Sequence, residues 1–214
     1  MKKSVTSILT LTIMALTATA SDTRRIKLDP PQIDRGLPVM TALSKRHSER
    51  VWADKPVSMR DLSNLLWAAD GVNRPDGKRT APSALGKNDI DIYVFTPEGA
   101  YHYLPDSQEI ELVAEGDHRD IVVGGQPNIT QLPPLAFVYV STPSRFGVPD
   151  RQASDNMGYV DGGMVSQNVG IACAGLGLVN VPRYTMDRAA LTDLLHLQEG
   201  TLLVLNDLIG YPRR

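Results

Sequence analysis

The sequence predicts one domain of the α+β class, because helical and strand patterns occur in runs rather than in strict alternation. The expected order is helix, helix, β-hairpin, strand, long helix, helix and strand. A chain of 214 residues suits one domain, and 42% hydrophobic with 21% charged residues permits a sizeable core. The formal net charge of −2 and the lack of a long basic run argue against general nucleic-acid binding.

The first 20 residues have the pattern of a signal peptide. Lys2 and Lys3 precede a stretch of apolar and small residues, and Ala18-Thr19-Ala20 gives the small-x-small motif that a signal peptidase reads. We therefore expect cleavage after Ala20 and a periplasmic or secreted bacterial protein without stable membrane insertion. The alternative is a retained membrane anchor, for which the apolar stretch is short and rich in threonine.

The segment after the signal is expected to be an extended arm. Residues 21–36 are polar and contain Pro30-Pro31, which disfavours a helix. The remaining residues, 37–214, are predicted to form the single domain. Its first helix opens at Leu37-Pro38, where proline suits the first turn, and ends near Arg46-His47-Ser48.

The second predicted helix has clearer boundaries. Ser58 is a suitable N-cap, Asp61 follows three residues later, and apolar residues continue at helical spacing to Gly71, which suits the exit. Residues 73–88 are rich in glycine, proline and charged side chains and are predicted to be a long loop. Long ordered loops in compact domains are often functional.

A hairpin and a central strand are predicted next. Residues 90–96 and 100–104 alternate around Pro97-Glu98-Gly99, as the two arms of a β-hairpin do. The uninterrupted apolar run at residues 135–141 predicts a strand that is buried on both faces.

The last third of the chain predicts two helices and a final strand. Residues 159–174 are small and apolar almost all round, which suits close packing between helices or between subunits. Residues 187–197 have the pattern of an amphipathic helix, and residues 202–209 that of a strand leading directly into Gly210-Tyr211-Pro212.

Several common catalytic signatures are missing. The chain has no Gly-x-Gly-x-x-Gly, no Walker loop, no Gly-x-Ser-x-Gly and no His or Cys pair at zinc spacing. Cys173 is the only cysteine and lies in an apolar stretch, so we expect a buried and unreactive thiol.

Two cationic segments at opposite ends of the chain are candidate anion sites. Arg46-His47-Ser48-Glu49-Arg50 offers two guanidinium groups and a hydroxyl, which can hold a phosphate by charge-assisted hydrogen bonds. Arg213-Arg214 ends the chain. Taken alone, the first segment is better explained as an ordinary solvated helix end and the second as a frayed terminus.

Two further segments could contact a flat ligand. Arg79-Thr80-Ala81-Pro82-Ser83-Ala84 combines a rigid proline with small residues that permit close approach, although an ordinary surface loop reads the same way. Gly175-Leu176-Gly177-Leu178 leads to Val181-Pro182-Arg183-Tyr184; its glycines also fit a simple helix C-cap.

In this order, the features resemble the nitroreductase superfamily, and within it the SagB-type dehydrogenases of thiazole and oxazole peptide maturation. The resemblance covers about residues 37–214. It is carried by Arg46-His47-Ser48-x-Arg50, Leu65-Leu66-Trp67-Ala68-Ala69-x-Gly71, Arg79-Thr80-x-Pro82-Ser83-Ala84, Asp161-Gly162-Gly163, Gln167-Asn168, Gly175-Leu176-Gly177, Val181-Pro182 to Tyr184-Thr185 and Gly210-Tyr211-Pro212. It implies a central, mostly antiparallel sheet flanked by helices, in an intertwined homodimer with FMN at the subunit interface.

The resemblance also implies which residues bind FMN. They are Arg46, His47, Ser48, Arg50, Pro82, Ser83, Ala84, Pro182, Tyr184, Thr185, Arg213 and Arg214. The first arginine, the serine and one C-terminal arginine would bind the phosphate, and Arg50 would reach the flavin ring. The loop at 82–84 would lie against the partner's flavin, and the turn at 182–185 would place a backbone N–H near flavin N5. No catalytic side chain and no metal are implied.

The sequence departs from the family branch after Ala84. That branch often continues with Gly and a His-Pro or Tyr-Pro pair, whereas this chain has Leu85-Gly86-Lys87-Asn88-Asp89. Only two residues follow Pro212, so a C-terminal arm that embraces the partner, as in some relatives, is not expected.

The implied function is that of an exported FMN-dependent oxidoreductase. It would transfer hydride by ping-pong turnover to or from a small organic substrate, such as a nitro compound or a quinone. Two alternatives stay open. One is an azoline-type peptide dehydrogenase, for which a clear Lys-Tyr pair is missing, and the other is a flavin-binding protein without turnover.

Overall fold

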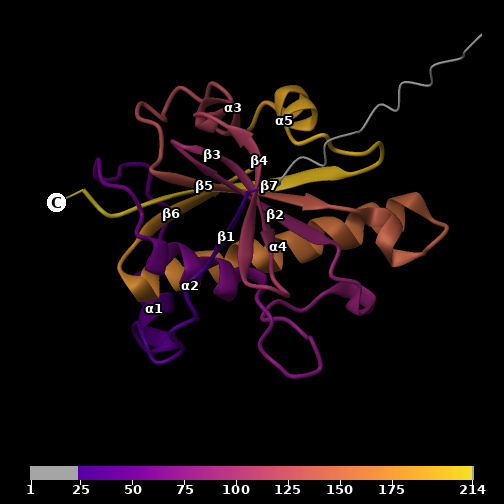
Figure 1. Ribbon diagram of the computed structural model, residues 1–214, viewed down its shortest axis with the longest axis horizontal. Coiled ribbons are helices and arrows are strands. Elements are labelled where there is room, and N and C mark those ends of the chain that lie inside the picture. The colour runs from indigo at the N-terminus through magenta and orange to yellow at the C-terminus, as the bar shows by residue number, and fades with distance from the viewer. Residues whose placement is uncertain (1–23, 214) are drawn as a thin grey trace, which may run out of the picture.

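The computed structural model describes residues 24–213, which form one antiparallel sheet with helices on both faces (Figure 1). The strands are β1 (Arg25–Lys27), β2 (Ile90–Thr96), β3 (Gly99–Leu104), β4 (Glu109–Glu115), β5 (Leu135–Ser141), β6 (Val179–Arg183) and β7 (Leu202–Gly210). The helices are α1 (Val39–Lys45), α2 (Met59–Asp70), α3 (Arg119–Val123), α4 (Arg151–Leu176) and α5 (Arg188–Leu194), with short 3₁₀ turns η1 (Ala84–Gly86) and η2 (Pro143–Phe146). The predicted α+β class is confirmed.

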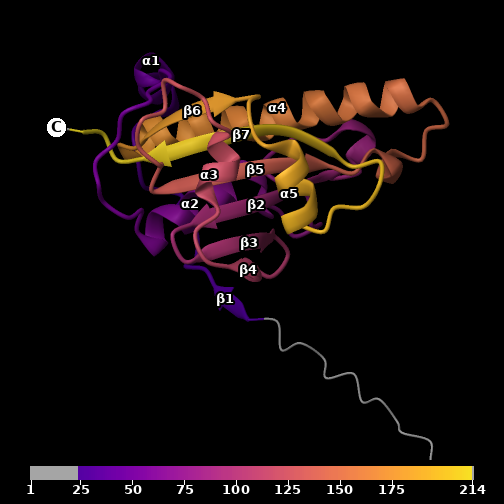
Figure 2. The ribbon, with the colours of Figure 1, turned by 90° about the horizontal axis from the view of Figure 1, so that it is seen from above.

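The sheet order is β1-β4-β3-β2-β5-β7-β6, and all neighbouring strands pair antiparallel. Figure 2 shows this order from edge to edge, with α4 along the β6 side. The predicted hairpin is β2–β3, joined at Thr96 and Gly99. The predicted central strand is β5, which lies between β2 and β7.

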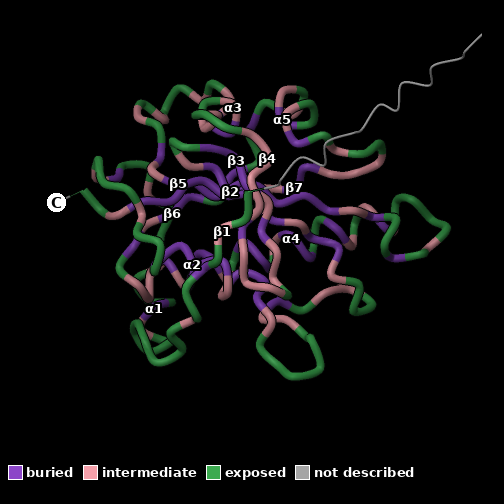
Figure 3. The backbone as a smooth tube through the Cα atoms, viewed as in Figure 1, coloured by how far each residue is buried: buried purple, intermediate pink, exposed green. Residues whose placement is uncertain are grey.

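Two hydrophobic clusters cover the two faces of the sheet, and β5 contributes alternately to both. Leu135, Phe137 and Tyr139 pack with residues of α2 and α4, whereas Ala136 and Val138 pack with residues of α3 and α5. Every residue of β5 is buried, so the uninterrupted apolar run has a direct cause. Figure 3 shows the strands buried at the centre and the exposed positions on the outer loops and helix faces.

The strand β4 is not apparent from the sequence pattern because a β-bulge interrupts its alternation. Ala100 pairs with Ala114, but the next residue, Tyr101, pairs with Leu112, so Val113 is an extra residue in β4. The bulge produces the apolar run Leu112-Val113-Ala114, in which the strand period of two is lost.

The long helix α4 begins eight residues before the predicted start at Tyr159. Asp150 is its N-cap, with a side chain that accepts a hydrogen bond from the Ala153 N–H at 3.2 Å. The first two turns are polar and therefore lack the apolar pattern on which the prediction rested. Gly177, in the left-handed conformation with φ +79°, ends the helix.

Part of the predicted arm joins the sheet. Arg25–Lys27 forms the edge strand β1 beside β4, and Leu28 is buried. The predicted signal peptide, residues 1–20, and Arg214 lie outside the described residues. Within residues 24–213, none of the helices combines the length and the apolar character that crossing a bilayer requires.

Candidate functional site

The segment after α1 and the C-terminal residues meet at the β6 edge of the sheet. Ser48 forms a parallel bridge with Asn180 of β6, and the Glu49 N–H donates to the Asn180 carbonyl at 3.0 Å. A few residues later, Trp52 pairs with Pro212. The segment after α1 is therefore fixed between β6 and the last residues of the chain, as Figure 2 shows near the C-terminus.

Tight packing around Trp52 holds this junction together. The Trp52 side chain is fully buried, and its indole N–H donates to the Leu132 carbonyl at 2.9 Å. A Cβ on Gly210 would lie 2.6 Å from the Trp52 Cβ, so only glycine fits at the end of β7. The predicted Gly210-Tyr211-Pro212 ending thus serves to bring the C-terminus beside the segment after α1.

A pocket of about 220 Å³ opens at this junction. It is lined by Lys45, Arg46, His47, Gly170, Ala174, Gly177, Leu178, Val179, Asn180 and Pro212. Arg46 is the C-cap residue of α1 and is half-buried, whereas His47, Ser48 and Arg50 are exposed. The Arg46 side chain lies alongside Gly170 of α4: its Cδ would be 3.6 Å from a Cβ at that position, an ordinary contact distance.

In the described part of the chain, the arginines at this edge have no carboxylate partner, although Glu49 stands between them and approaches His47 to 4.0 Å. Among the ion pairs of residues 24–213, none involves Arg46, Arg50 or Arg183. Arg213 is exposed just beyond Pro212. Such a group of cations without acidic partners attracts an anion, and the guanidinium geometry suits phosphate in particular.

Arg183, at the end of β6, is a buried cation that the sequence analysis did not select. Its guanidinium donates only to neutral acceptors: Gln126 Oε1 at 2.6 Å, the Val123 carbonyl at 2.7 Å and Asn206 Oδ1 at 3.3 Å. Burial, and then the charge of Arg50, lower the pKa of Arg183. Its proximity to Arg50 depends on strand pairing, which local sequence does not reveal.

The segment predicted as a turn around Pro182 belongs instead to the strand β6. Because β6 is the edge of the sheet, a proline without an N–H is tolerated there. Pro182, Tyr184 and Thr185 are all exposed at this edge. The Arg188 guanidinium lies 4.1 Å from the centre of the Tyr184 ring, so a further cation is close to these residues.

A buried carboxyl group underlies Asn180. Asp207 accepts hydrogen bonds from the Tyr139 hydroxyl, the Ser166 hydroxyl and the Asn180 amide, each at 2.7 Å. Burial raises the pKa of Asp207, and the three hydrogen bonds oppose that rise. The network fixes Asn180 in the pocket wall. Cys173 is buried nearby, as expected, and burial raises the pKa of its thiol.

The loop Pro82-Ser83-Ala84 lies elsewhere on the same subunit. It packs beside Asp161 of α4, whereas the pocket involves Gly170 of the same helix. Nine residues separate these two positions, which is roughly 14 Å along the helix axis. Within one chain the structure therefore brings together the residues at 46–50, 182–185 and 213 at the β6 edge, but not the loop.

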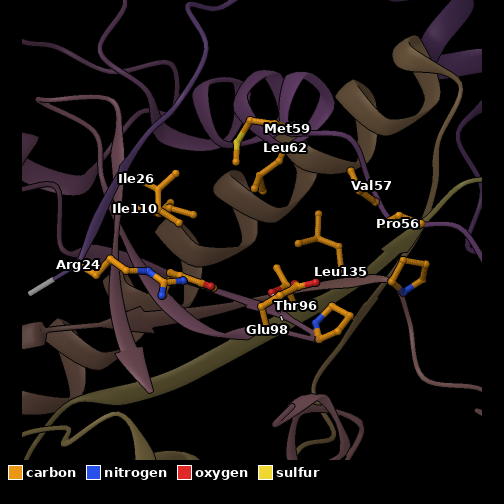
Figure 4. Close-up of a pocket in the computed structure, with 13 residues that line it drawn as sticks. Arg24, Ile26, Pro56, Val57, Met59, Leu62, Thr96, Glu98, Ile110 and Leu135 are labelled. Atoms are coloured by element: carbon orange, nitrogen blue, oxygen red, sulfur yellow. Dashed lines mark hydrogen bonds between the residues drawn. The ribbon is translucent and has the colours of Figure 1, made fainter. Parts of the chain in front are cut away.

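A separate apolar pocket of about 310 Å³ contains none of the predicted site residues (Figure 4). Ile26 and Ile110 line one side of it, Met59 and Leu62 of α2 another, and Glu98 of the hairpin turn a third. It has no cluster of cations comparable to that at the β6 edge. We therefore assign the candidate site to the pocket lined by Arg46, Asn180 and Pro212, which we call the chain-end pocket.

Comparisons with known proteins agree with the fold. Residues 43–211 match the model of the Nitroreductase family. A crystal structure of a protein from Ralstonia eutropha JMP134, described as a nitroreductase, is similar with a TM-score of 0.83 and 33% identity, covering 92% of this chain and 93% of that chain. A Methanocaldococcus jannaschii protein, also named as a nitroreductase, is 26% identical over 192 residues, 86% of this chain and 96% of its own length.

A second similar structure was solved with a cofactor. It is a nitroreductase from Desulfovibrio desulfuricans in complex with FMN, with a TM-score of 0.60 and 18% identity, covering 83% of this chain and 88% of that chain. At this identity the likeness concerns the fold. The nitroreductase-like architecture expected from the sequence is confirmed by these matches.

Proposed function

Because this chain belongs to the nitroreductase family, we propose that it is an FMN-dependent oxidoreductase that acts as a homodimer. The observation that supports this proposal best is the chain-end pocket, where Lys45, Arg46 and His47 line the wall beside Pro212, and exposed Arg213 follows directly. The FMN bound to the Desulfovibrio relative is consistent with a flavin here.

The residues of the pocket fit the phosphate end of FMN. Arg46 and Lys45 lie in its wall, and the backbone of Ser48 pairs with Asn180, which also lines it. Arg213, and Arg214 after it, would supply charge from the other end of the chain. These groups would bind the phosphate by charge-assisted hydrogen bonds and fix the orientation of the ring.

The β6 edge would serve the flavin ring. FMN supplies the hydride chemistry when bound, and the protein binds, orients and tunes it. Arg50, with Arg183 behind it, would place positive charge where reduction puts negative charge on the ring, and so raise its reduction potential. Pro182, Tyr184 and Thr185 would form the wall against the ring, with a backbone N–H directed at its reactive nitrogen.

The loop at 82–84 would complete the partner subunit's site. It lies too far along α4 to serve the pocket of its own chain, so a dimer with flavin in the interface accounts for both segments. The substrate would be a small electron acceptor or donor such as a nitro compound or quinone, with ping-pong turnover. An azoline-containing peptide is the second substrate class to assay, and a bound flavin without turnover would indicate a binding protein.

The experiment that tests the cofactor is titration of the purified protein with FMN. A yellow, FMN-binding dimer supports the proposal, whereas a colourless protein that does not bind FMN contradicts it. Arg46→Ala should weaken FMN binding by about 1.5–3 kcal/mol, the scale of a charged hydrogen bond. The control Arg60→Ala changes an exposed arginine on α2, away from the pocket, and should leave the affinity unchanged.

Export is also part of the proposal. N-terminal sequencing of the protein from the periplasm should find Ser21 as the first residue. NADH and NADPH are normally confined to the cytoplasm, so an exported enzyme would use another electron donor or act as a dehydrogenase. Rapid reduction of the holoenzyme by NADH or NADPH at physiological concentrations, measured by stopped flow, would contradict this part.

A further inference from the structure

The loop between α2 and β2 is held against α4 by carboxyl groups. The Asp161 side chain of α4 accepts a hydrogen bond from the Ala84 N–H at 2.7 Å. Asp89, at the other end of the loop, accepts from the Ser141 hydroxyl of β5 through Oδ2. Figures 1 and 2 both show this loop and η1 beside α4.

The loop needs such anchors because its backbone is strained. Leu85 has φ +54° and Asn88 has φ +48°, a left-handed conformation that non-glycine residues rarely adopt. The Ser83 hydroxyl accepts from the Asn88 N–H at 2.8 Å, which closes the loop on itself. The hydrogen bond from Ala84 to Asp161 then ties it to the body of the subunit.

Asp89 and Asp161 face the same small cavity, and each has one oxygen without a partner. Asp89 is 0% exposed and Asp161 is 1% exposed. Within residues 24–213, the Oδ1 atoms of both are buried and accept no hydrogen bond. The cavity has a volume of about 10 Å³. That is no more room than a single water needs, so a hydrated cation does not fit.

The neighbouring arginines form ion pairs with other carboxylates. Arg79 pairs with Asp70 at 2.6 Å, and Asp70 lines the same cavity. On the far side of β2, Arg145 pairs with Asp91 at 2.7 Å.

The remaining charged groups of this region do not supply a counter-ion either. His102 of β3 lies 3.4 Å from Asp91, and Lys87 of the loop is exposed. Two ionised carboxylates cannot remain side by side in a buried site without a cation. One of the two must therefore carry a proton, and that proton can bridge the two unpartnered oxygens.

We propose that Asp89 and Asp161 share one proton, and that this protonated pair positions the Pro82-Ser83-Ala84 loop. The role of the loop toward the flavin rests on the proposed function, but the shared proton does not. When the proton leaves, repulsion would move Asp161 away from the Ala84 N–H, and the strained loop would lose its tie to α4. Asp89 and Asp161 are thus positioning residues that act through the loop.

The direction of the pH dependence follows from burial. Burial, together with Asp161, raises the pKa of Asp89 to about 7. A carboxyl group with a raised pKa in the folded state stabilises the fold fully below its unfolded pKa, about 3.9. That contribution is lost as the pH rises through about 7.

Amide substitutions test the pair without removing its hydrogen bonds. In Asp89→Asn the amide oxygen can still accept from Ser141 while the NH₂ group donates to Asp161. Asp161→Asn allows the reverse arrangement. Both variants should therefore fold and should lose the decline in unfolding free energy that this group causes between about pH 4 and about pH 7. The control Asp106→Asn, at an exposed position, should keep the wild-type profile.

A spectroscopic readout detects the proton itself. The infrared spectrum of the wild type should contain the carbonyl stretch of a buried carboxylic acid that disappears with a midpoint near pH 7. Subtracting the Asp89→Asn spectrum should isolate this band from those of other buried acids. If the band is missing from the difference, or if the amide variants keep the wild-type pH profile of stability, the shared proton is wrong.

FMN titration at several pH values separates this inference from the proposed function. Wild-type affinity should weaken as the pH passes about 7, and the affinity of Asp89→Asn should stay level. Affinity with the same pH profile in both proteins contradicts the positioning role. Absence of FMN binding at every pH contradicts the proposed function instead, and the stability and infrared measurements still decide the shared proton.

Discussion

At the residue scale, the missing side chain of Gly210 keeps the segment after α1 close to the C-terminal residues. The position it occupies allows β7 to pass directly against the Trp52 side chain, and the bridge from Trp52 to Pro212 depends on that contact. The cations on either side of the pocket are therefore placed by a packing contact, not by their own interactions.

Gly210→Ala should destabilise the fold by about 1–3 kcal/mol, the range for overpacking a filled core. The added methyl group would meet the Trp52 Cβ at 2.6 Å, and the backbone would have to shift. Denaturant unfolding measures the loss. A stability equal to that of the wild type would show that the junction can relax at no cost.

Asp207 gives a second prediction at this scale. Asp207→Asn replaces an acceptor of three hydrogen bonds with a side chain that can accept at only one end, so a buried donor loses its partner. A loss of about 1–3 kcal/mol in unfolding free energy is expected. The control Asp106→Ser, at an exposed position, should change the unfolding free energy little.

The sequence identifies residues whose role is local and misses those whose role depends on pairing. Arg46 and Ser48 stand in one short motif, which is a candidate anion site that the family resemblance assigns to the FMN phosphate. Arg183 and Asp207 were missed because their partners come from other strands and helices. Asp207 in particular stands within a strongly apolar strand, where nothing in the neighbouring residues indicates that three donors converge on it.

At the element scale, α4 is the helix on which the other parts of the site depend. Its 26 residues span roughly 39 Å and carry the loop anchor Asp161 near the middle and Gly170 toward the end. Two adjacent glycines of α4 stand in different surroundings. Gly162 faces β7, where a Cβ would lie 2.6 Å from Val204 Cγ1, whereas Gly163 has no atom within 4 Å of that position.

The adjacent glycines predict opposite effects of the same substitution. Gly162→Ala should destabilise the protein by about 1–3 kcal/mol because Val204 is a stiff, buried neighbour. Gly163→Ala should stabilise it by about 0.5–1 kcal/mol through helix propensity. Thermal and denaturant unfolding of the two variants test this, and effects of the same sign would contradict the packing described.

Sequence patterns predicted α2, the β2–β3 hairpin, β5 and β7 well because each has a complete periodic pattern or a cap. The first turns of α4 and the strand β4 were missed for physical reasons: a polar helix surface and a β-bulge both remove the apolar period. The strand β6 was not predicted either, because a strand accepts a proline such as Pro182 only at the edge of a sheet, and the local sequence does not show which strands are neighbours.

At the scale of the whole molecule, exposed apolar side chains gather on α1 and on the middle of α4. Val39, Met40 and Leu43 of α1 and Val160 and Met164 of α4 are all exposed, and α1 packs along α4. Exposed apolar side chains of this kind are typical of an interface. In the proposed dimer we expect the second copy of the chain to cover them.

Met40→Glu and Val160→Glu should therefore weaken the dimer, because each would place a charge in an apolar interface. Met40 is 74% exposed and Val160 is 55% exposed in the single chain, so neither change should unfold the subunit. Sedimentation should show a shift toward monomer. Leu132→Glu, at an exposed apolar position away from α1 and α4, is the control and should stay dimeric.

The place of β7 in the sheet has a consequence for biosynthesis. Among the strands that the structure describes it comes last, yet it joins β5 to β6. Until Gly210 has emerged from the ribosome, β6 has no partner strand and β5 is paired with β2 alone. Completion of the sheet must therefore wait for this late segment, which leaves the growing polypeptide open to chaperones until then.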